Sequence, residues 1–224
     1  MTFSIVARCA HTGMFGVAVS SSSPAVAARC VYAQAGVGAV ASQNVTDPTL
    51  GTRALGLMAL GASALDAVSI IRRTGCHIEY RQLLAVDANG VSAIYSGSKI
   101  LGVWGEARSE NVACGGNLLA NNGVPQAMVD AFMSSNGPLG DRLVATLRAA
   151  LKAGGEAGPV RSAGMRLVRD VAWPVADLRC DWTEDCPIEQ LARLWDLYKP
   201  QLGNYVLRAI DPSAAPSYGV PGDE

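Results

Sequence analysis

The sequence lacks a long run of apolar residues. No stretch reaches the ~18 consecutive apolar residues that a membrane-spanning helix needs. No positively charged segment followed by an apolar one opens the chain, so the pattern of a secretory signal is missing. We therefore expect a soluble, cytoplasmic protein without a membrane partner.

The sequence also lacks an excess of either charge. Its 18 Lys and Arg residues nearly balance 19 Asp and Glu residues, which leaves a formal net charge of −1. Proteins that bind nucleic acids or anionic membranes usually carry a basic surface. We therefore expect no nucleic-acid partner, and a small molecule is the expected ligand.

Histidine and paired cysteine are scarce. His11 and His77 are the only histidines, and no two of the six cysteines form a C-x-x-C pair. A structural zinc site has no support from this spacing. We expect reduced thiols, mostly buried as small apolar side chains, and neither a metal nor another cofactor.

Apolar residues and glycine are plentiful. Half of the 224 residues are hydrophobic, which is enough for one full core. The 24 glycines exceed the usual share of ~7% and indicate tight turns and close backbone approaches. We expect a main domain over residues 1–182 and a C-terminal part, 183–224, made of a helix and a Pro- and Gly-rich tail. At about 40 residues this part is too small to hold a core alone, so we expect it to pack on the main domain or on a partner subunit.

Hydrophobic periodicity predicts strands and paired helices in alternation. The expected strands are residues 2–9, 15–22, 37–43, 81–86, 91–95, 112–114, 162–169 and 175–180. The expected helices are residues 52–60, 64–73, 125–133 and 139–152, with a last helix opening at 185–187. Helix pairs between antiparallel hairpins favour an α+β fold over βαβ winding. Two packed sheets with helices outside, a four-layer αββα sandwich, would bury both faces of the apolar strand at 37–43.

The first strand places a hydroxyl at the start of the chain. If His11, Thr12 and Gly13 form the hairpin loop, Thr2 lies opposite Ser22, give or take one residue, beside the serines at 20–23. Removal of Met1 would give Thr2 a free α-amine as its base, the arrangement of an N-terminal-nucleophile (Ntn) hydrolase. In that case Ser21 or Ser22 would tune the amine. The alternative is an ordinary strand with one polar face.

Five segments resemble one family. These are TFSIVAR (2–8), AGVGAVASQNVTDP (35–48), EYRQL (79–83), GGNLL (115–119) and APSYGVPGDE (215–224). The family is bacterial and archaeal, has no assigned function, and is grouped with the Ntn hydrolases by fold. The resemblance implies the αββα sandwich, without a settled reaction. Gly115, and the stretch Gly158 to Ser162, depart from the commoner family pattern and indicate a subgroup.

Uncharged amides are candidates for stabilising an oxyanion. Gln43, Asn44 and Asn117 lie at strand ends or Gly-rich turns, where a side-chain amide can donate to developing negative charge. They also match recurrent positions of the family. The alternative is that each amide stabilises its own turn.

Four charged residues are candidates for binding a polar, carboxylated substrate. Glu79 and Arg81 are two apart on an expected strand, a face that His77 would share, and an internal ion pair is the alternative. Arg8 shares the strand face of Thr2, and it could instead pair with an acid. Glu156 follows a helix end, where the family tends to have an acid.

Two functions remain open from the sequence. The first is an amidohydrolase that cleaves a small polar amide, linear or cyclic, with Thr2 as nucleophile; Cys9 is a rival nucleophile, although its position in the strand indicates core. The second is a non-catalytic ligand-binding or assembly protein that keeps Met1. A homodimer or higher homo-oligomer is expected in either case.

Overall fold

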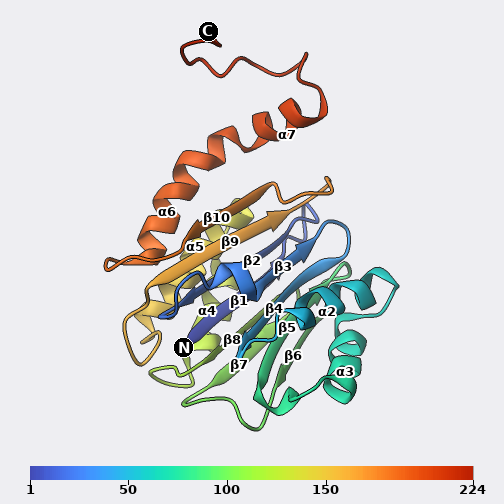
Figure 1. Ribbon diagram of the computed structural model, residues 1–224, viewed down its shortest axis with the longest axis vertical. Helices are drawn as coiled ribbons and strands as arrows, with labels where there is room; N and C mark the ends of the chain where they lie inside the picture. The colour runs from blue at the N-terminus through green and yellow to red at the C-terminus, as the bar shows by residue number, and fades with distance from the viewer. Residues whose placement is uncertain (224) are drawn as a thin grey trace.

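The computed structural model describes residues 1–223 and has two stacked antiparallel sheets with helices on their outer faces (Figure 1). The expected α+β four-layer αββα sandwich is confirmed. Glu224, the last residue of the expected C-terminal part, lies outside the described residues.

One sheet has six strands and contains the start of the chain. Its order is β10-β9-β2-β1-β8-β7. The strands are β1 (Thr2–Arg8), β2 (Phe15–Ser21), β7 (Gly105–Ser109), β8 (Val112–Asn117), β9 (Ser162–Val168) and β10 (Ala176–Cys180). Since β1 lies between β2 and β8, it is a central strand, and its residues from Thr2 to Ala7 are buried.

The second sheet has four strands in the order β3-β4-β5-β6. They are β3 (Val31–Gln34), β4 (Gly38–Asn44), β5 (Arg81–Asp87) and β6 (Ser92–Ser96). Strand β4 is buried from Gly38 to Gln43, as the apolar sequence of this segment predicts. Side chains of both sheets meet in one apolar layer that includes Val6, Val17, Ala41 and Leu84.

Helices cover the two outer faces. α2 (Thr49–Ala59) and α3 (Ala64–Thr74) pack on the four-stranded sheet, and α4 (Val124–Ser134) and α5 (Leu139–Lys152) pack on the six-stranded sheet. A short α1 (Ala27–Cys30) follows β2. Ser63 caps α3 by accepting a hydrogen bond from the Asp66 amide at 3.1 Å, as the sequence motif predicts.

The β1–β2 hairpin sets the register of the N-terminus. Gly13 has a φ of +69°, which the expected loop requires. Phe3 pairs with Ser20, so Thr2 comes beside Ser21, within the one-residue allowance of the sequence analysis. On its other side Thr2 pairs with Asn117 of β8.

Several parts of the structure differ from the expectation. Residues Ile78–Tyr80 form a 3₁₀ turn instead of a strand, because His77 enters it in the left-handed region with a φ of +52°. His77, Glu79 and Arg81 therefore share no strand face. Strands β3 and β7 were not expected, and neither was α7 (Leu202–Ile210).

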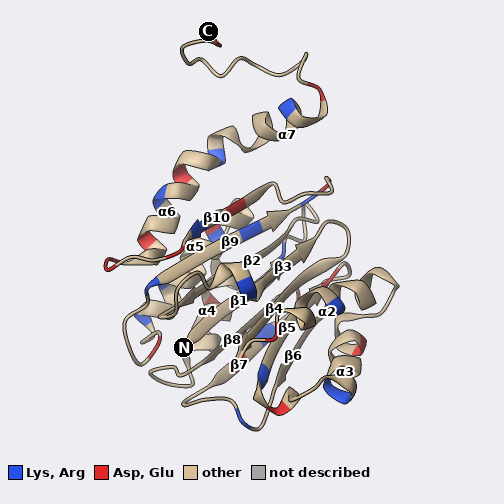
Figure 2. Ribbon diagram, viewed as in Figure 1, with Lys and Arg blue, Asp and Glu red and all other residues tan. Residues whose placement is uncertain are grey.

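The C-terminal helices extend from one edge of the sandwich. α6 (Pro187–Tyr198) packs on β9, β10 and α5, while α7 and the tail project away from the sheets (Figure 1). Acidic and basic residues alternate along α6 (Figure 2). Among the helices of residues 1–223, none combines the length and apolar character needed to cross a membrane.

Candidate active site

Thr2 lies at the buried end of β1. The residue is only 6% exposed, and its Oγ1 is 3.3 Å from Oγ of Ser21. The Met1 carbonyl accepts hydrogen bonds from both hydroxyls. The Met1 side chain lies near Gly158, since a Cβ added there would be 3.4 Å from Met1 Cε. The peptide bond that precedes Thr2 is thus held by the hydroxyl cluster beside it.

A chain of hydroxyls runs from Thr2 to an arginine. Ser21 Oγ is 2.8 Å from Ser23 Oγ, which accepts a hydrogen bond from Nη2 of Arg29 at 2.6 Å. Such a chain polarises its members and fixes their orientation. Ser23 and Arg29 were missed as site residues, although the run of four serines at 20–23 pointed to this cluster.

Glu156 brings a carboxyl group to the same end of the sandwich. It follows two glycines with positive φ, Gly154 at +118° and Gly155 at +61°, which turn the chain sharply after α5. Its two oxygens accept the Ser22 amide hydrogen at 3.2 and 3.1 Å. Burial raises the pKa of Glu156 to about 7, although the positive chain terminus and the Ser22 hydrogen bonds oppose this shift. The carboxyl therefore lies within electrostatic reach of the N-terminus and titrates near neutral pH.

Side-chain amides form a buried network between the two sheets. Ser4 Oγ donates to Gln43 Oε1 at 2.6 Å, and Gln43 Nε2 donates to Gln82 Oε1 at 2.8 Å. Asn117 Nδ2 makes a longer contact of 3.5 Å to the same Gln82 oxygen. Ser4, Gln43 and Gln82 are fully buried, and Asn117 is 1% exposed. This network joins Asn117, the strand partner of Thr2, to Gln43 on the facing sheet.

Gln82 was missed by the sequence analysis. Its Nε2 donates to Ser96 Oγ at 3.1 Å and to the Gly105 carbonyl at 3.2 Å, so it ties β5 to β6 and to β7 of the other sheet. Gly115 lies next to this amide, since a Cβ there would be 3.4 Å from Gln82 Nε2, an ordinary contact distance. The available signal was its place in the segment EYRQL (79–83), which resembles the family; its pairing with Gln43 across β4 and β5 is visible only in the structure.

Asn44 ends β4, Arg81 begins β5 opposite it, and Glu79 lies in the 3₁₀ turn before β5, all at the same end of the four-stranded sheet. Asn44 has a φ of +78° and donates to the Tyr80 carbonyl, while its Oδ1 accepts from the Leu101 amide at 3.3 Å. Arg81 donates to the Val45 carbonyl. Glu79 pairs with Lys99 at 3.5 Å on the surface. These contacts stabilise turns, and none of the three residues contacts Thr2 or Ser21.

Arg8 lies at the other end of β1. Six residue steps along a strand separate it from Thr2 by about 20 Å, and its Nη1 donates to Asn111 Oδ1 at 3.2 Å. The expectation that Arg8 serves the Thr2 site is therefore wrong for a small substrate. Strand alternation places the two residues on one face but says nothing of the distance between them.

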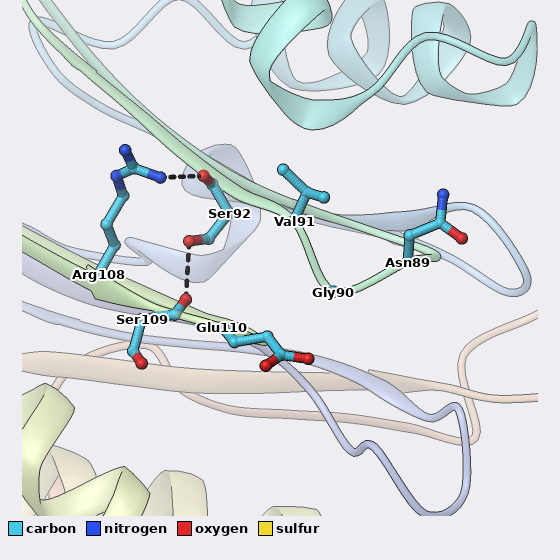
Figure 3. Close-up of a pocket in the computed structure, with 7 residues that line it drawn as sticks. All are labelled: Asn89, Gly90, Val91, Ser92, Arg108, Ser109 and Glu110. Carbon is cyan, nitrogen blue, oxygen red and sulfur yellow. Dashed lines mark hydrogen bonds between the residues drawn. The ribbon is translucent and has the colours of Figure 1, made fainter.

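Cys9 also lies at the Arg8 end. Its side chain is 8% exposed and belongs to the core beside Phe3, Ile5 and Ala7, as its place in the strand predicts. A cavity of about 560 Å³ at this end is lined by the β5–β6 and β7–β8 turns (Figure 3). There Arg108 donates to the Ser92 carbonyl at 2.8 Å, and Ser92 Oγ donates to the Ser109 carbonyl at 2.8 Å. These polar groups satisfy one another's hydrogen-bonding capacity, and their arrangement does not indicate a catalytic site.

Within residues 1–223, no three His, Cys, Asp or Glu side chains converge in a way that could hold a metal ion. The functional groups around Thr2 are hydroxyls, amides and one carboxyl. Such a set can move a proton and stabilise an oxyanion.

Comparison with solved structures gives a strong similarity to another member of one family. Protein SPO2555 from Silicibacter pomeroyi, which carries the family model DUF1028, is 32% identical and superposes with a TM-score of 0.82 over 92% of this chain and 91% of its own. No curated protein matches the sequence significantly.

Two structures of Anbu (ancestral beta-subunit) are much less similar. The protein from Yersinia bercovieri is 10% identical with a TM-score of 0.38, over 91% of this chain and 96% of its own. The Gly-1 mutant from Hyphomicrobium sp. strain MC1 is 11% identical with a TM-score of 0.41, over 90% and 96%. Similarity at this level carries no information about activity.

The family comparison covers most of the sequence. Residues 2–191 match the family described as "Family of unknown function (DUF1028)", and the match begins at Thr2. The chain belongs to the DUF1028 family.

Proposed function

We propose that this protein is an Ntn-type amidohydrolase, in which removal of Met1 frees Thr2 to act as nucleophile and base on a small polar amide. The observation that carries the proposal is the setting of Thr2, whose buried hydroxyl lies 3.3 Å from Ser21 Oγ and beside Asn117 in the sheet. The resemblance of the whole chain to a family grouped with the Ntn hydrolases by fold supports it further.

In the proposed mechanism the free α-amine of Thr2 takes the proton from Thr2 Oγ1 as this oxygen attacks the amide carbon. The side-chain amide of Asn117 and backbone N–H groups stabilise the oxyanion. The amine then passes the proton to the leaving nitrogen, the C–N bond breaks, and water hydrolyses the remaining ester. Gln43 and Gln82 act as positioning residues, because they contact Asn117 or its network and not Thr2.

Ser21 and Glu156 would set the protonation of that amine. Ser21 Oγ now donates to the Met1 carbonyl and would be left beside the new terminus. Glu156 is within electrostatic reach of the chain start and favours the protonated amine when it is ionised. Ser22 would help by holding Glu156 through its backbone amide.

The first test measures processing and activity together. We expect intact-mass measurement of natively expressed protein to show the loss of one methionine, and a panel of small linear and cyclic amides to contain one that is cleaved. Protein prepared with Met1 retained should be inactive. After Met1 removal is verified, Thr2→Ala should lose at least 100-fold in kcat, whereas Thr52→Ala on the surface of α2 should keep full activity.

The alternative is a ligand-binding or assembly protein with Met1 in place. The observation that favours it is the Met1 carbonyl, which is already bound by the hydroxyls of Thr2 and Ser21. Retention of Met1 in the native protein, or full amidase activity in Thr2→Ala, would decide for this function. Leu197 (70% exposed) and Ile210 (62%) on the C-terminal helices support an oligomer in either case, which light scattering can measure.

A further inference from the structure

A second cavity lies at the opposite end of β1 from Thr2. It encloses about 240 Å³ between the β1–β2 turn, the β7–β8 turn and the loop that joins α4 to α5. Arg8, His11 and Arg142 line it. Three side chains able to donate hydrogen bonds to an anion therefore surround one small cavity.

Arg8 has unused donors at this cavity. Its Nη1 donates to Asn111, but its Nε is buried and has no hydrogen-bond partner. Across residues 1–223 only one other buried side-chain polar atom shares this condition, Nε of Arg81. Buried donors are normally satisfied in native proteins, because an unsatisfied one destabilises the folded state. Because Arg8 Nε has almost no accessible surface, an anion in the cavity would meet Nη2 instead, which makes no hydrogen bond within residues 1–223.

Arg142 is held rigidly on the other side. Its Nε donates to Ser135 Oγ at 3.3 Å and its Nη2 to the Phe132 carbonyl at 2.9 Å, with the guanidinium carbon 3.8 Å from the centre of the Phe132 ring. These contacts fix the side chain and leave Nη1 without a hydrogen bond within the described residues. A guanidinium fixed in this way loses little entropy when it binds an anion.

The charge at the cavity is not neutralised internally. Glu110 is the one acidic residue that lines it, is exposed, and makes no ion pair within 4.0 Å with Arg8 or Arg142. The Cys9 thiol lines the same cavity. Burial raises its pKa, but hydrogen bonds from Thr12 and His11 and the charge of Arg142 outweigh this, and the net shift is downward. The hydrogen bonds contribute more to this downward shift of the pKa than the charge of Arg142 does.

We propose that this cavity is a binding site for a small oxyanion, a phosphate or a carboxylate, held between Arg8 and Arg142. Arg8 donates to it through Nη2, and Arg142 through Nη1. The site is separate from Thr2, and the proposal does not rest on amidohydrolase activity.

Calorimetric titration with inorganic phosphate and with succinate, at constant ionic strength, tests the proposal. We expect saturable one-to-one binding of at least one anion. Arg8→Gln and Arg142→Gln should each weaken it at least tenfold. Arg72→Gln, a surface change on α3 beside Tyr95, is the matched control and should bind like the wild type. Thr2→Ala should also bind normally, which separates this site from the proposed active site.

A second readout covers the case in which Arg142→Gln fails to fold. Arg142→Lys keeps the charge and should retain part of the affinity. The bound anion should also slow alkylation of Cys9 in the wild type, measured by peptide mass spectrometry with exposed Cys76 as internal reference. The proposal is overturned if neither anion binds saturably, or if Arg8→Gln binds as tightly as the wild type.

Discussion

Glu156 couples the stability of the protein to pH. Its pKa is about 7 in the folded protein and 4.5 in its ordinary state, because the carboxyl is buried. The folded state therefore holds this proton more tightly than the unfolded state does. The contribution of Glu156 to stability is complete below about pH 4.5 and is lost as the pH rises through about 7.

We expect Glu156→Gln to remove this loss. The Gln oxygen can still accept the Ser22 amide, but no charge is buried at alkaline pH. At pH 8 the variant should be more stable than the wild type by on the order of 2 kcal/mol, and the two should converge toward pH 4.5. Urea unfolding at several pH values measures this, with exposed Glu110→Gln as control. Equal slopes of stability against pH in wild type and Glu156→Gln would contradict the assignment.

Individual residues of the candidate site were predictable to different degrees. Thr2 and Ser21 could be placed together because strand register is arithmetic once a turn is recognised, whereas the pairing of Thr2 with Asn117 depends on which distant strand lies beside β1. Gln82 could not, because it meets Asn117 only through the stacking of two sheets. Arg8 was expected near Thr2 because alternation along β1 puts both side chains on one face. Alternation does not say how far apart along the strand two residues lie.

A matched pair of glycines tests how the C-terminal helix is attached. A Cβ on Gly140 of α5 would lie 2.4 Å from the buried Trp195 ring of α6, whereas Gly203 of α7 has open space. We expect Gly140→Ala to cost about 1–3 kcal/mol because α6 must move. Gly203→Ala should be neutral or add up to about 1 kcal/mol, since alanine favours a helix. Thermal unfolding monitored by Trp fluorescence compares them, and equal midpoints would contradict the close packing of α5 and α6.

Helices and strands that end at a recognisable turn or glycine signal were predictable from the sequence. The bounds of α5 agree with the prediction because Gly154 and Gly155 end it, and the Asn-Gly turn between β5 and β6 has Gly90 at a φ of +81°. Strands β3 and β7 escaped prediction because each lies at a sheet edge with mixed polarity. Their pairing partners, and not their own sequences, make them strands.

At the scale of the whole molecule, two truncations test which part of the C-terminal segment the core needs for stability. Ile188 and Leu191 of α6 are fully buried and Trp195 is 3% exposed, whereas the segment after Asp211 is mostly exposed. A chain ending at Asp211 should keep the unfolding midpoint of the full protein. A chain ending at Thr183 loses those three anchors, each worth roughly 1.5–3 kcal/mol, and should fail to fold cooperatively in urea titrations. A stable chain ending at Thr183 would show that the main domain is independent of α6.

Because β1 is a central strand, the order of synthesis limits when the six-stranded sheet can form around it. Its neighbour β8 is made about a hundred residues later than β1, so the six-stranded sheet cannot close around the first strand until most of the protein has left the ribosome. Once it closes, Met1 is half-buried and its carbonyl is bonded to two hydroxyls. If Met1 is removed as proposed, an aminopeptidase would have to reach it while the nascent polypeptide is still open, so the pace of translation would set the time available for that step.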